Sequence, residues 1–393
     1  MGKMKVMEIS QGIAESIKAC KPKVISAYPI TPQTHIVEHL ARMVSDGELD
    51  AVYIWADSEF AAASIVCGAS AAGVRTYTAS ASQGILLMTE VLWNIAGLRL
   101  PVVLTCTNRV VSAPVSIEVD HQDSLSLRDS GIIQLYVEEA QEAYDAHIMA
   151  YKLAEDPEVL LPVMVCVDGW VLTHAYEPIE LLDQDVVDSF LPPYKPIQYL
   201  TPEDPLTFGN WGDDTVLMET KYMMHLAMER AKMKFEEISK EFAKLTGHNY
   251  GGVIEEYNIE DAEICLIAMG SVCGVIKDTV DELREEGVKV GLIKIRLFRP
   301  FPYEEVAKAV KNAKCVVTLD RAISLGSQGI LALDVKGCLY DFEEKPLVLS
   351  CIAGLGGKEI TKDIVRGIVF KARNLVERGG VKEKIEWVGL SYG

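Results

Sequence analysis

Short apolar runs alternate with amphipathic stretches along residues 23–168. The apolar runs predict β-strands at residues 23–27, 52–55, 75–79, 101–107 and 161–168. The stretches between them predict helices at residues 33–45, 58–72 and 84–96, the first with Ile36, Val37, Leu40 and Val44 on one face. The last two strands are apolar almost throughout, as strands buried on both faces are. The alternation therefore predicts an α/β fold with a parallel sheet covered by helices on both sides.

The pattern changes between about residues 175 and 213, where prolines are frequent and regular periods are few. The prolines of this segment are Pro178, Pro192, Pro193, Pro196, Pro202 and Pro205. We predict a long, mostly irregular arm over residues 175–213, which lies over the surface or on a partner. A polar helix is predicted to follow over residues 214–245.

A second alternation of strands and helices begins near residue 262. It predicts strands at residues 263–269, 288–297 and 315–319, and a helix at residues 272–286. We therefore divide the chain near residue 250, into a first domain of residues 1–250, which includes the arm, and a second domain of residues 251–393.

The net charge and the lengths of the apolar runs argue against some classes of binding partner. The formal net charge is −19, which disfavours nucleic acid, because lysine and arginine must neutralise its backbone. No apolar run approaches the roughly 18–20 residues of a membrane span. Glu8, Ser10 and Gln11 interrupt the region after the first five residues, where a secretory signal would be continuously apolar. We predict a cytoplasmic protein whose partners include neither nucleic acid nor a membrane.

The nine cysteines are scattered, and no two of them are spaced C-x-x-C. Most lie within apolar runs, so we expect reduced thiols in a cytoplasmic protein. An iron–sulfur cluster needs clustered thiolates. We therefore do not expect this chain to bind one by itself.

The turn Tyr28-Pro29-Ile30-Thr31-Pro32 joins a predicted strand to a predicted helix. At the carboxyl edge of a parallel sheet, such a turn lies where ligands bind. Thr31 offers a hydroxyl at this edge. The alternative interpretation is that Thr31 is the N-cap of the following helix.

Glu59 opens a predicted helix of otherwise small and apolar residues, in the sequence Asp57-Ser58-Glu59-Phe60. The helix dipole alone would favour a carboxylate in this first turn. A partly buried glutamate also needs a partner. A nitrogen heterocycle that hydrogen-bonds to the carboxylate would supply one.

Arg109 follows an apolar strand, in the sequence Thr107-Asn108-Arg109. Its forked guanidinium is suited to gripping a carboxylate. The alternative is a salt bridge to an acidic residue further along the chain, at Asp120, Asp123 or Asp129. The loop Ser80-Ala81-Ser82-Gln83-Gly84 also ends a strand, so it either faces a ligand or lets a helix approach the sheet closely.

Several familiar phosphate-binding motifs are absent from the sequence. There is neither a G-x-G-x-x-G nor a Walker A sequence, which argues against a nicotinamide-dependent dehydrogenase. There is also no Gly-Asp-Gly with a suitably placed asparagine, since Val167-Asp168-Gly169 only approaches it. We assign no metal ligands to this chain.

Taken together, the Tyr28–Pro32 turn, the glutamate of Asp57-Ser58-Glu59, the Ser80–Gly84 loop and Thr107-Asn108-Arg109 resemble the alpha subunit of pyruvate:ferredoxin oxidoreductase and its relatives. The resemblance continues through Ser112-Ala113-Pro114, Gln122-Asp123, Leu161-Pro162 and Arg299-Pro300-Phe301-Pro302 to Ile352-Ala353-Gly354-Leu355-Gly356-Gly357. It implies that the first domain has the pyrimidine-binding fold of thiamine diphosphate enzymes. The second would resemble the carboxyl-terminal domain of transketolase.

The resemblance also implies roles for single residues. Glu59 matches the glutamate that hydrogen-bonds the aminopyrimidine ring of thiamine diphosphate, and Thr31 and Arg109 match the residues that bind the substrate carboxylate. These three would be the catalytic residues, with Tyr28, Pro29 and Gln83 beside the cofactor. The implied reaction is the reversible oxidative decarboxylation of pyruvate with coenzyme A to acetyl-CoA and carbon dioxide, with electrons passing to ferredoxin.

Such a chain would act only in a complex. The resemblance implies that thiamine diphosphate is shared with a beta-type subunit, and that Mg²⁺ and the [4Fe–4S] clusters belong to partner subunits of the beta, gamma and delta types. Two alternatives stay open at this stage. One is the same chemistry on 2-oxoisovalerate or, without coenzyme A, on oxalate. The other is a non-catalytic scaffold that keeps the fold.

Overall fold

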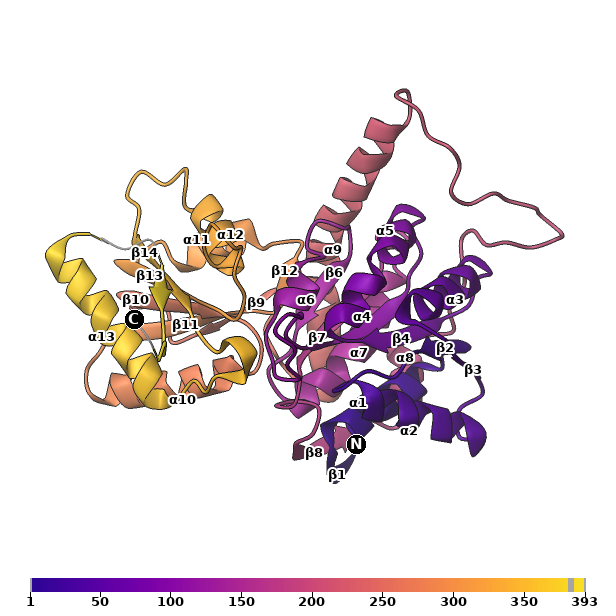
Figure 1. The fold of residues 1–393 in the computed structure, drawn as a ribbon, viewed down its shortest axis with the longest axis horizontal. Helices are drawn as coiled ribbons and strands as arrows, with labels where there is room; N and C mark the ends of the chain where they lie inside the picture. Colours follow the sequence, from indigo (N-terminus) through magenta and orange to yellow (C-terminus); the bar gives the residue numbers. More distant parts are fainter. Residues whose placement is uncertain (1, 381–384, 392–393) are drawn as a thin grey trace.

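The computed structural model describes residues 2–380 and 385–391, whose strands form two large sheets and one small one (Figure 1). The first sheet has the strand order β12-β6-β7-β5-β4-β2-β3, and all its paired strands are parallel except β12 against β6. Its strands are β2 (Val24–Ala27), β3 (Val52–Trp55), β4 (Thr76–Ser80), β5 (Val103–Asn108), β6 (Ile133–Tyr136), β7 (Val163–Asp168) and β12 (Leu297–Arg299).

Helices cover both faces of this sheet, as Figure 1 shows. On one side α1 packs against α2 and α7, and on the other α3 packs against α4 and α5. These helices are α1 (Ile9–Cys20), α2 (Thr34–Ser45), α3 (Glu59–Ala71), α4 (Ser82–Leu87), α5 (Thr89–Gly97) and α7 (Ala140–Ala154), with the short α6 (Gln122–Leu125) after β5. The single helix predicted at residues 84–96 is therefore two helices, α4 and α5, which meet at Met88.

The predicted irregular arm of residues 175–213 is wrong in its first part. Strand β8 (Tyr176–Leu181) pairs antiparallel with β1 (Lys3–Glu8), and helix α8 (Gln184–Phe190) follows it. Pro178 does not prevent the strand, because a two-stranded sheet has only edge strands, in which proline is tolerated. From residue 191 to residue 216 the chain is mostly irregular and extends away from the body with the first turns of α9 (Leu217–Thr246) (Figure 1). We call residues 191–216 the arm.

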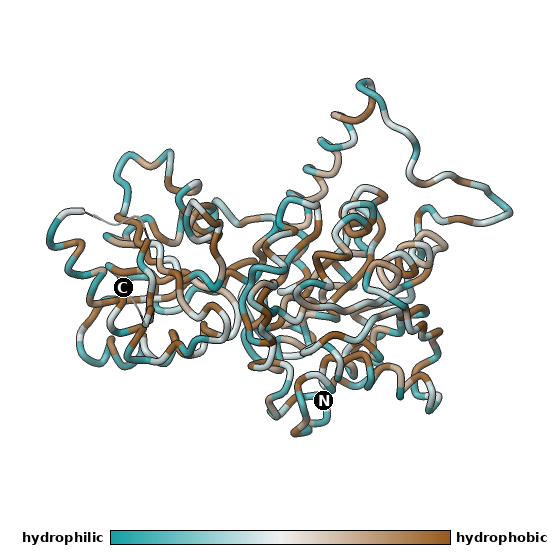
Figure 2. Tube along the Cα trace, viewed as in Figure 1, coloured by the Kyte–Doolittle hydropathy of each residue, from teal (hydrophilic) through white to brown (hydrophobic). Residues whose placement is uncertain are grey.

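The second large sheet has the order β15-β14-β13-β10-β11-β9, parallel except for β9 against β11. Its strands are β9 (Ile254–Tyr257), β10 (Ile264–Ala268), β11 (Val290–Ile295), β13 (Cys315–Asp320), β14 (Leu347–Ile352) and β15 (Glu386–Trp387). Its helices are α10 (Val272–Glu285), α11 (Tyr303–Ala309), α12 (Ile330–Cys338) and α13 (Lys362–Arg378), with a 3₁₀ turn at Leu355–Gly357. Figure 2 shows hydrophobic residues along the strands of both sheets.

The strand predicted at residues 288–297 ends earlier, because the chain crosses between the sheets there. Strand β11 ends at Ile295, and β12 then pairs with β6 of the first sheet, Leu297 opposite Leu135. The division of the chain near residue 250 stays a prediction, since β12 belongs to the first sheet although it follows that point. Within the described residues no helix is long and apolar enough to cross a membrane.

A buried carboxylate joins the two large sheets. Asp168, at the carboxyl end of β7, lies 2.7 Å from Arg321 Nη1, which follows β13, and 2.7 Å from His121 Nε2. The backbone N–H of Ser271, which precedes α10, donates to Asp168 at 3.0 Å. Although burial opposes ionisation, His121 and Arg321 hold the pKa of Asp168 well below its usual range. The ionised carboxylate therefore fixes parts of both sheets to each other.

A second buried cluster lies on α7. Glu142, which is fully buried, is 2.7 Å from Lys294 Nζ of β11 and 2.6 Å from Arg296 Nε. Lys294 also contacts Glu138 and Glu255 of β9, at 2.8 and 3.3 Å. Every charge of this cluster is paired, as burial requires. The cluster ties α7 of the first sheet to β9 and β11 of the second.

Candidate active site

The site segments follow four neighbouring strands of the first sheet. The order β5-β4-β2-β3 consists of parallel pairs, so the carboxyl ends of these strands lie along one edge. The Tyr28–Pro32 turn follows β2, Glu59 follows β3, the Ser80–Gly84 loop follows β4 and Arg109 follows β5. Strand order reverses between β2 and β4, which is the position where open α/β sheets bind ligands.

Gln33 anchors the turn after β2 and was not expected from the sequence. Its side chain is fully buried, and Nε2 donates to the carbonyl oxygen of Ala79 on β4 at 2.7 Å. The backbone N–H of Ile30 donates to Gln33 Oε1 at 3.3 Å. Helix α2 begins only at Thr34, with Gln33 as its N-cap residue. Thr31 is therefore not the N-cap, and it lies exposed at the edge of the sheet.

Arg109 and Thr31 are in direct contact. Arg109 Nη1 donates to the carbonyl oxygen of Thr31 at 2.8 Å, and Nε donates to that of Ser116 at 2.7 Å. The guanidinium makes no ion pair with any described residue, so the salt bridge to Asp120, Asp123 or Asp129, the alternative interpretation of this arginine, does not form. Burial lowers the pKa of Arg109, and the negative charge of Asp123 partly opposes this shift. Two of the five guanidinium N–H donors are used, which leaves donors for a bound carboxylate.

Asp123 organises the loops around Arg109. Its fully buried carboxylate accepts hydrogen bonds from the backbone N–H groups of Ser82 and Arg109, at 2.9 and 3.0 Å. It also accepts from Asn108 Nδ2 and from the backbone of Ser124, at 2.8 and 2.7 Å. Burial raises the pKa of Asp123, and these hydrogen bonds limit the rise. Asp123 thus holds the loops after β4 and β5 together, a role that the sequence alone did not reveal.

Glu59 lies in the first turn of α3, whose N-cap Ser58 accepts from the backbone N–H of Ala61 at 3.2 Å. The Glu59 residue is buried, at 7 % exposure, yet its carboxylate has no hydrogen-bond partner among the described residues. A Cβ atom added at Gly84 would lie 2.6 Å from Glu59 Oε1. The hydroxyl of Ser80, also next to Gly84, is buried and has no hydrogen-bond partner in the described part of the chain. The side chains of Glu59 and Ser80 thus both lie next to Gly84, and neither has a hydrogen-bond partner among the described residues.

This arrangement fits an aminopyrimidine ring, which presents the N–H groups that a buried carboxylate needs. Of the other predicted residues, Tyr28 and Pro29 are exposed on the same turn as Thr31. Gln83 accepts a hydrogen bond from the hydroxyl of Ser82. The structure thus brings Thr31 to Arg109 and Glu59 to Gly84, along one sheet edge. No direct contact joins these two pairs.

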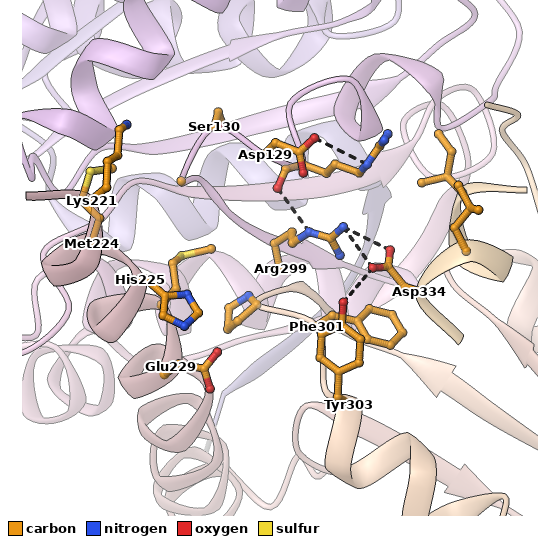
Figure 3. Close-up of a pocket in the computed structure, with 16 residues that line it drawn as sticks. Asp129, Ser130, Lys221, Met224, His225, Glu229, Arg299, Phe301, Tyr303 and Asp334 are labelled. Carbon is orange, nitrogen blue, oxygen red and sulfur yellow. Dashed lines mark hydrogen bonds and ion pairs between the residues drawn. The ribbon is translucent and has the colours of Figure 1, made fainter. Parts of the chain in front are cut away.

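A cavity of about 590 Å³ lies elsewhere, between α9, α12 and the segment after β12 (Figure 3). None of the predicted site residues lines it. Figure 3 shows Arg299 and Tyr303 pointing toward Asp334, which they contact at 3.1 Å each. These polar groups satisfy one another, so we interpret them as part of the joint between the two large sheets.

Two family models match the chain. The model described as pyruvate flavodoxin/ferredoxin oxidoreductase, thiamine diphosphate-binding, matches residues 15–240. The model described as pyruvate:ferredoxin oxidoreductase core domain II matches residues 262–365. The first includes Thr31, Glu59 and Arg109, and it covers more than half of the chain.

Curated relatives agree with the family models. The chain is 48% identical to the pyruvate synthase subunit PorA of Methanosarcina barkeri, over 96% of this chain and 94% of that one. It is 41% identical to the ketoisovalerate oxidoreductase subunit VorA of Pyrococcus horikoshii, over 98% of both.

Solved structures share the fold. A 2-oxoglutarate:ferredoxin oxidoreductase from Magnetococcus marinus has a TM-score of 0.71 at 20% identity, covering 94% of this chain and 65% of that one. A split-gene transketolase has a TM-score of 0.55 at 13% identity, covering 93% and 97%. The expected thiamine-enzyme fold is thus confirmed, and with the family models and the curated relatives it follows that the chain belongs to the pyruvate:ferredoxin oxidoreductase family, as a subunit with a thiamine diphosphate-binding domain.

Proposed function

We propose that this chain is the alpha subunit of a cytoplasmic pyruvate:ferredoxin oxidoreductase. The complex would convert pyruvate and coenzyme A to acetyl-CoA and carbon dioxide, reversibly, with ferredoxin as electron carrier. The observation that carries the proposal is the 48% identity, over nearly the full length, to a pyruvate synthase subunit. Two features of the described residues are consistent with it: the Glu59 carboxylate has no hydrogen-bond partner there, and the Arg109 guanidinium donates to two backbone carbonyls but forms no ion pair.

Glu59 is the residue that we assign to cofactor activation. Thiamine diphosphate supplies, when bound, a ring that stabilises the carbanion left by decarboxylation. The Glu59 carboxylate would accept a hydrogen bond from the aminopyrimidine ring and hold the tautomer whose amino group acts as a base. Gly84 leaves room for the Glu59 carboxylate itself, because a Cβ there would lie 2.6 Å from Glu59 Oε1. Tyr28, Pro29 and Gln83 would flank the cofactor.

Arg109 and Thr31 are the residues that we assign to the substrate carboxylate. The remaining N–H donors of the Arg109 fork would grip it, and the exposed Thr31 hydroxyl would be a second donor. The grip orients the bond that breaks. Because the negative charge of this carboxylate leaves as carbon dioxide, binding must position the substrate without over-stabilising it.

Replacing Arg109 with lysine is expected to lower kcat/KM for the 2-oxoacid by about 10–100-fold, mostly through a higher KM. Lysine keeps the charge but is a point donor that cannot form the planar fork. Steady-state kinetics of the reconstituted complex measure the effect. Arg128→Lys is the matched control, because Arg128 lines the separate cavity to which none of the predicted site residues contributes. An unchanged KM in the Arg109 variant would remove the carboxylate assignment.

A partner subunit is proposed to complete the site. Apolar side chains are exposed around Glu59, on β3, α3, α4 and α5: Trp55, Phe60, Leu86, Leu87 and Trp93. Large exposed apolar patches mark interaction surfaces, and β3 is also an unpaired sheet edge. The arm adds Trp211, at 97 % exposure. We infer that a beta-type subunit covers this face and binds the diphosphate with Mg²⁺. The [4Fe–4S] clusters would lie on partner subunits, including gamma and delta types.

The second candidate substrate is 2-oxoisovalerate, favoured by the 41% identity to a ketoisovalerate oxidoreductase subunit. Thr31 and Arg109 would bind the carboxylate of any 2-oxoacid. Discrimination would come from the side-chain pocket, for which the loop 112–117 after Arg109 is our candidate. Oxalate is disfavoured because no second arginine lies beside Thr31 in the sequence.

The test of the proposed function is an assay of the native complex. Reduction of a viologen dye would be compared for pyruvate, 2-oxoisovalerate and oxalate, each with and without coenzyme A. We expect pyruvate to give the highest kcat/KM. A higher value for 2-oxoisovalerate would keep the chemistry and replace the substrate. Absence of turnover with all three acids, in a complex that contains thiamine and iron, would contradict the proposed function.

A further inference from the structure

A cluster of two histidines and a glutamate lies apart from the proposed catalytic residues. His35 of α2, His174 of the turn before β8 and Glu8 at the end of β1 each offer one ligand atom, and these atoms lie within 4.8 Å of one another. His35 Nδ1 is 2.6 Å from Glu8 Oε1. The imidazole rings of His35 and His174 have centroids 4.7 Å apart.

We propose that Glu8, His35 and His174 bind a divalent transition-metal ion of the zinc class. Two imidazoles and one carboxylate form a donor set that zinc takes in proteins, with the fourth position left to water. Zinc–ligand bonds of about 2.0–2.2 Å require the three ligand atoms to lie closer to one another than the 4.8 Å within which they are found. The His35 imidazole is partly exposed, so its adjustment toward an ion would not require the core to repack.

The backbone of this cluster is already fixed without an ion. The N–H of Ile9, next to Glu8, donates to the carbonyl of Ala175 at 3.0 Å, and the Ser10 hydroxyl donates to that of Thr173 at 2.7 Å. Glu8 and His174 are thereby held on adjacent segments. Ligands carried by rigid elements lose little freedom on binding, which favours a preorganised site.

A neighbouring hydroxyl orients His174. Its Nδ1 lies 2.7 Å from Thr173 Oγ1, and when Nδ1 carries the proton the lone pair lies on Nε2. Metal-binding histidines usually donate their other ring N–H in this way. The ring of Trp170 also contacts this imidazole, with its centroid 4.1 Å from that of His174. The imidazole is therefore confined by a hydrogen bond and by ring contact.

The ion would brace the turn that carries Thr31. His35 follows Thr31 by four positions, and a Cβ atom added at Gly169, after β7, would lie 2.8 Å from the side chain of Pro32. One ion would therefore connect β1, the start of α2 and the segment that leaves β7. The role is structural, since no step of the proposed reaction uses these residues.

The test is metal binding by the full chain, freed of metal with a chelator and titrated with Zn²⁺ or Co²⁺. We expect one equivalent to bind, a Co²⁺ absorption spectrum typical of nitrogen and oxygen ligands, and a rise in Tm. His174→Ala and Glu8→Gln should each lose at least about 100-fold in affinity, because groups that only support ligands are worth about 10–100-fold.

His225→Ala is the matched control, since His225 is an exposed histidine on α9, and it should bind the ion normally. His35→Gln is a third ligand variant, and it should not disturb the fold because that side chain is 44 % exposed. Circular dichroism verifies the fold of each variant. Failure of the wild-type chain to bind one equivalent, or equal affinity in the ligand variants and the control, would overturn the proposal.

Discussion

Replacing Glu59 with alanine is expected to lower 2-oxoacid oxidation by the reconstituted complex by about 10²–10⁴-fold. The carboxylate is buried and has no partner among the described residues, so its hydrogen-bonding capacity is available to a ligand. Removal of the carboxylate leaves the aminopyrimidine ring without the group that would hold its reactive tautomer. The effect should fall on kcat, because a proton-transfer role acts in the transition state.

The measurement is viologen reduction by a complex rebuilt with the variant chain. Glu59→Gln separates charge from shape, since glutamine fills the same volume without the carboxylate. Glu90→Ala is the control, because Glu90 also lies in a first helical turn, that of α5, but is exposed. Bound thiamine is quantified in each complex, so that loss of cofactor and loss of chemistry are told apart. Wild-type turnover in the Glu59→Ala complex would contradict the catalytic assignment.

The position of the candidate site residues along one edge of the sheet was predictable, because it depends only on the direction of the strands that precede them. Four predicted strands were each followed by a residue with unused chemistry, and parallel strands bring such residues to one edge. The contact between Arg109 and Thr31 agrees with this expectation. The local sequence pattern was sufficient to place these residues, since each lies within a few positions of the end of its own strand.

Features that depend on distant contacts were not predictable. The sequence suggested Asp123 as a possible ion-pair partner of Arg109 and as part of the family resemblance, but gave it no structural role, yet its carboxylate binds backbone N–H groups of the loops after β4 and β5. Strand β12 was missed as a separate element because its pairing partner, β6, lies about 160 residues earlier. A carboxylate that binds backbone groups leaves no mark in a sequence, because every residue except proline offers the same N–H donor.

Replacing Glu142 with glutamine is expected to lower the free energy of unfolding by about 3–5 kcal/mol. The substitution leaves Arg296 buried without its carboxylate and removes one of the three partners of Lys294. Breaking a buried ion pair costs more than the pair contributes, because the remaining charge is left desolvated. Urea denaturation of the full chain, followed by circular dichroism, measures the change.

Glu241→Gln is the matched control, because its pair with Lys152 lies at the surface, with Glu241 52 % exposed. An exposed pair contributes about 0.2–1 kcal/mol, so the control should stay close to the wild type. Equal losses in the two variants would show that burial does not set the strength of the Glu142 cluster.

The acid sensitivity of the chain tests the same cluster independently. Burial alone would raise the pKa of Glu142, but Lys294 and Arg296 lower it from the usual 4.5 to about 2. A carboxyl with a lowered pKa stabilises the fold fully above its unfolded value, and this stabilisation is lost as the pH falls from about 4.5 toward 2. The wild-type chain should therefore lose stability over that interval by more than Glu142→Gln does, because the variant has no carboxyl to protonate there. The difference in stability between the two proteins should consequently be largest near neutral pH and shrink on acidification. If the difference stayed constant down to pH 2, the Glu142 carboxylate would not be the ionised partner of Lys294 and Arg296, and the link between the two sheets would depend on packing alone.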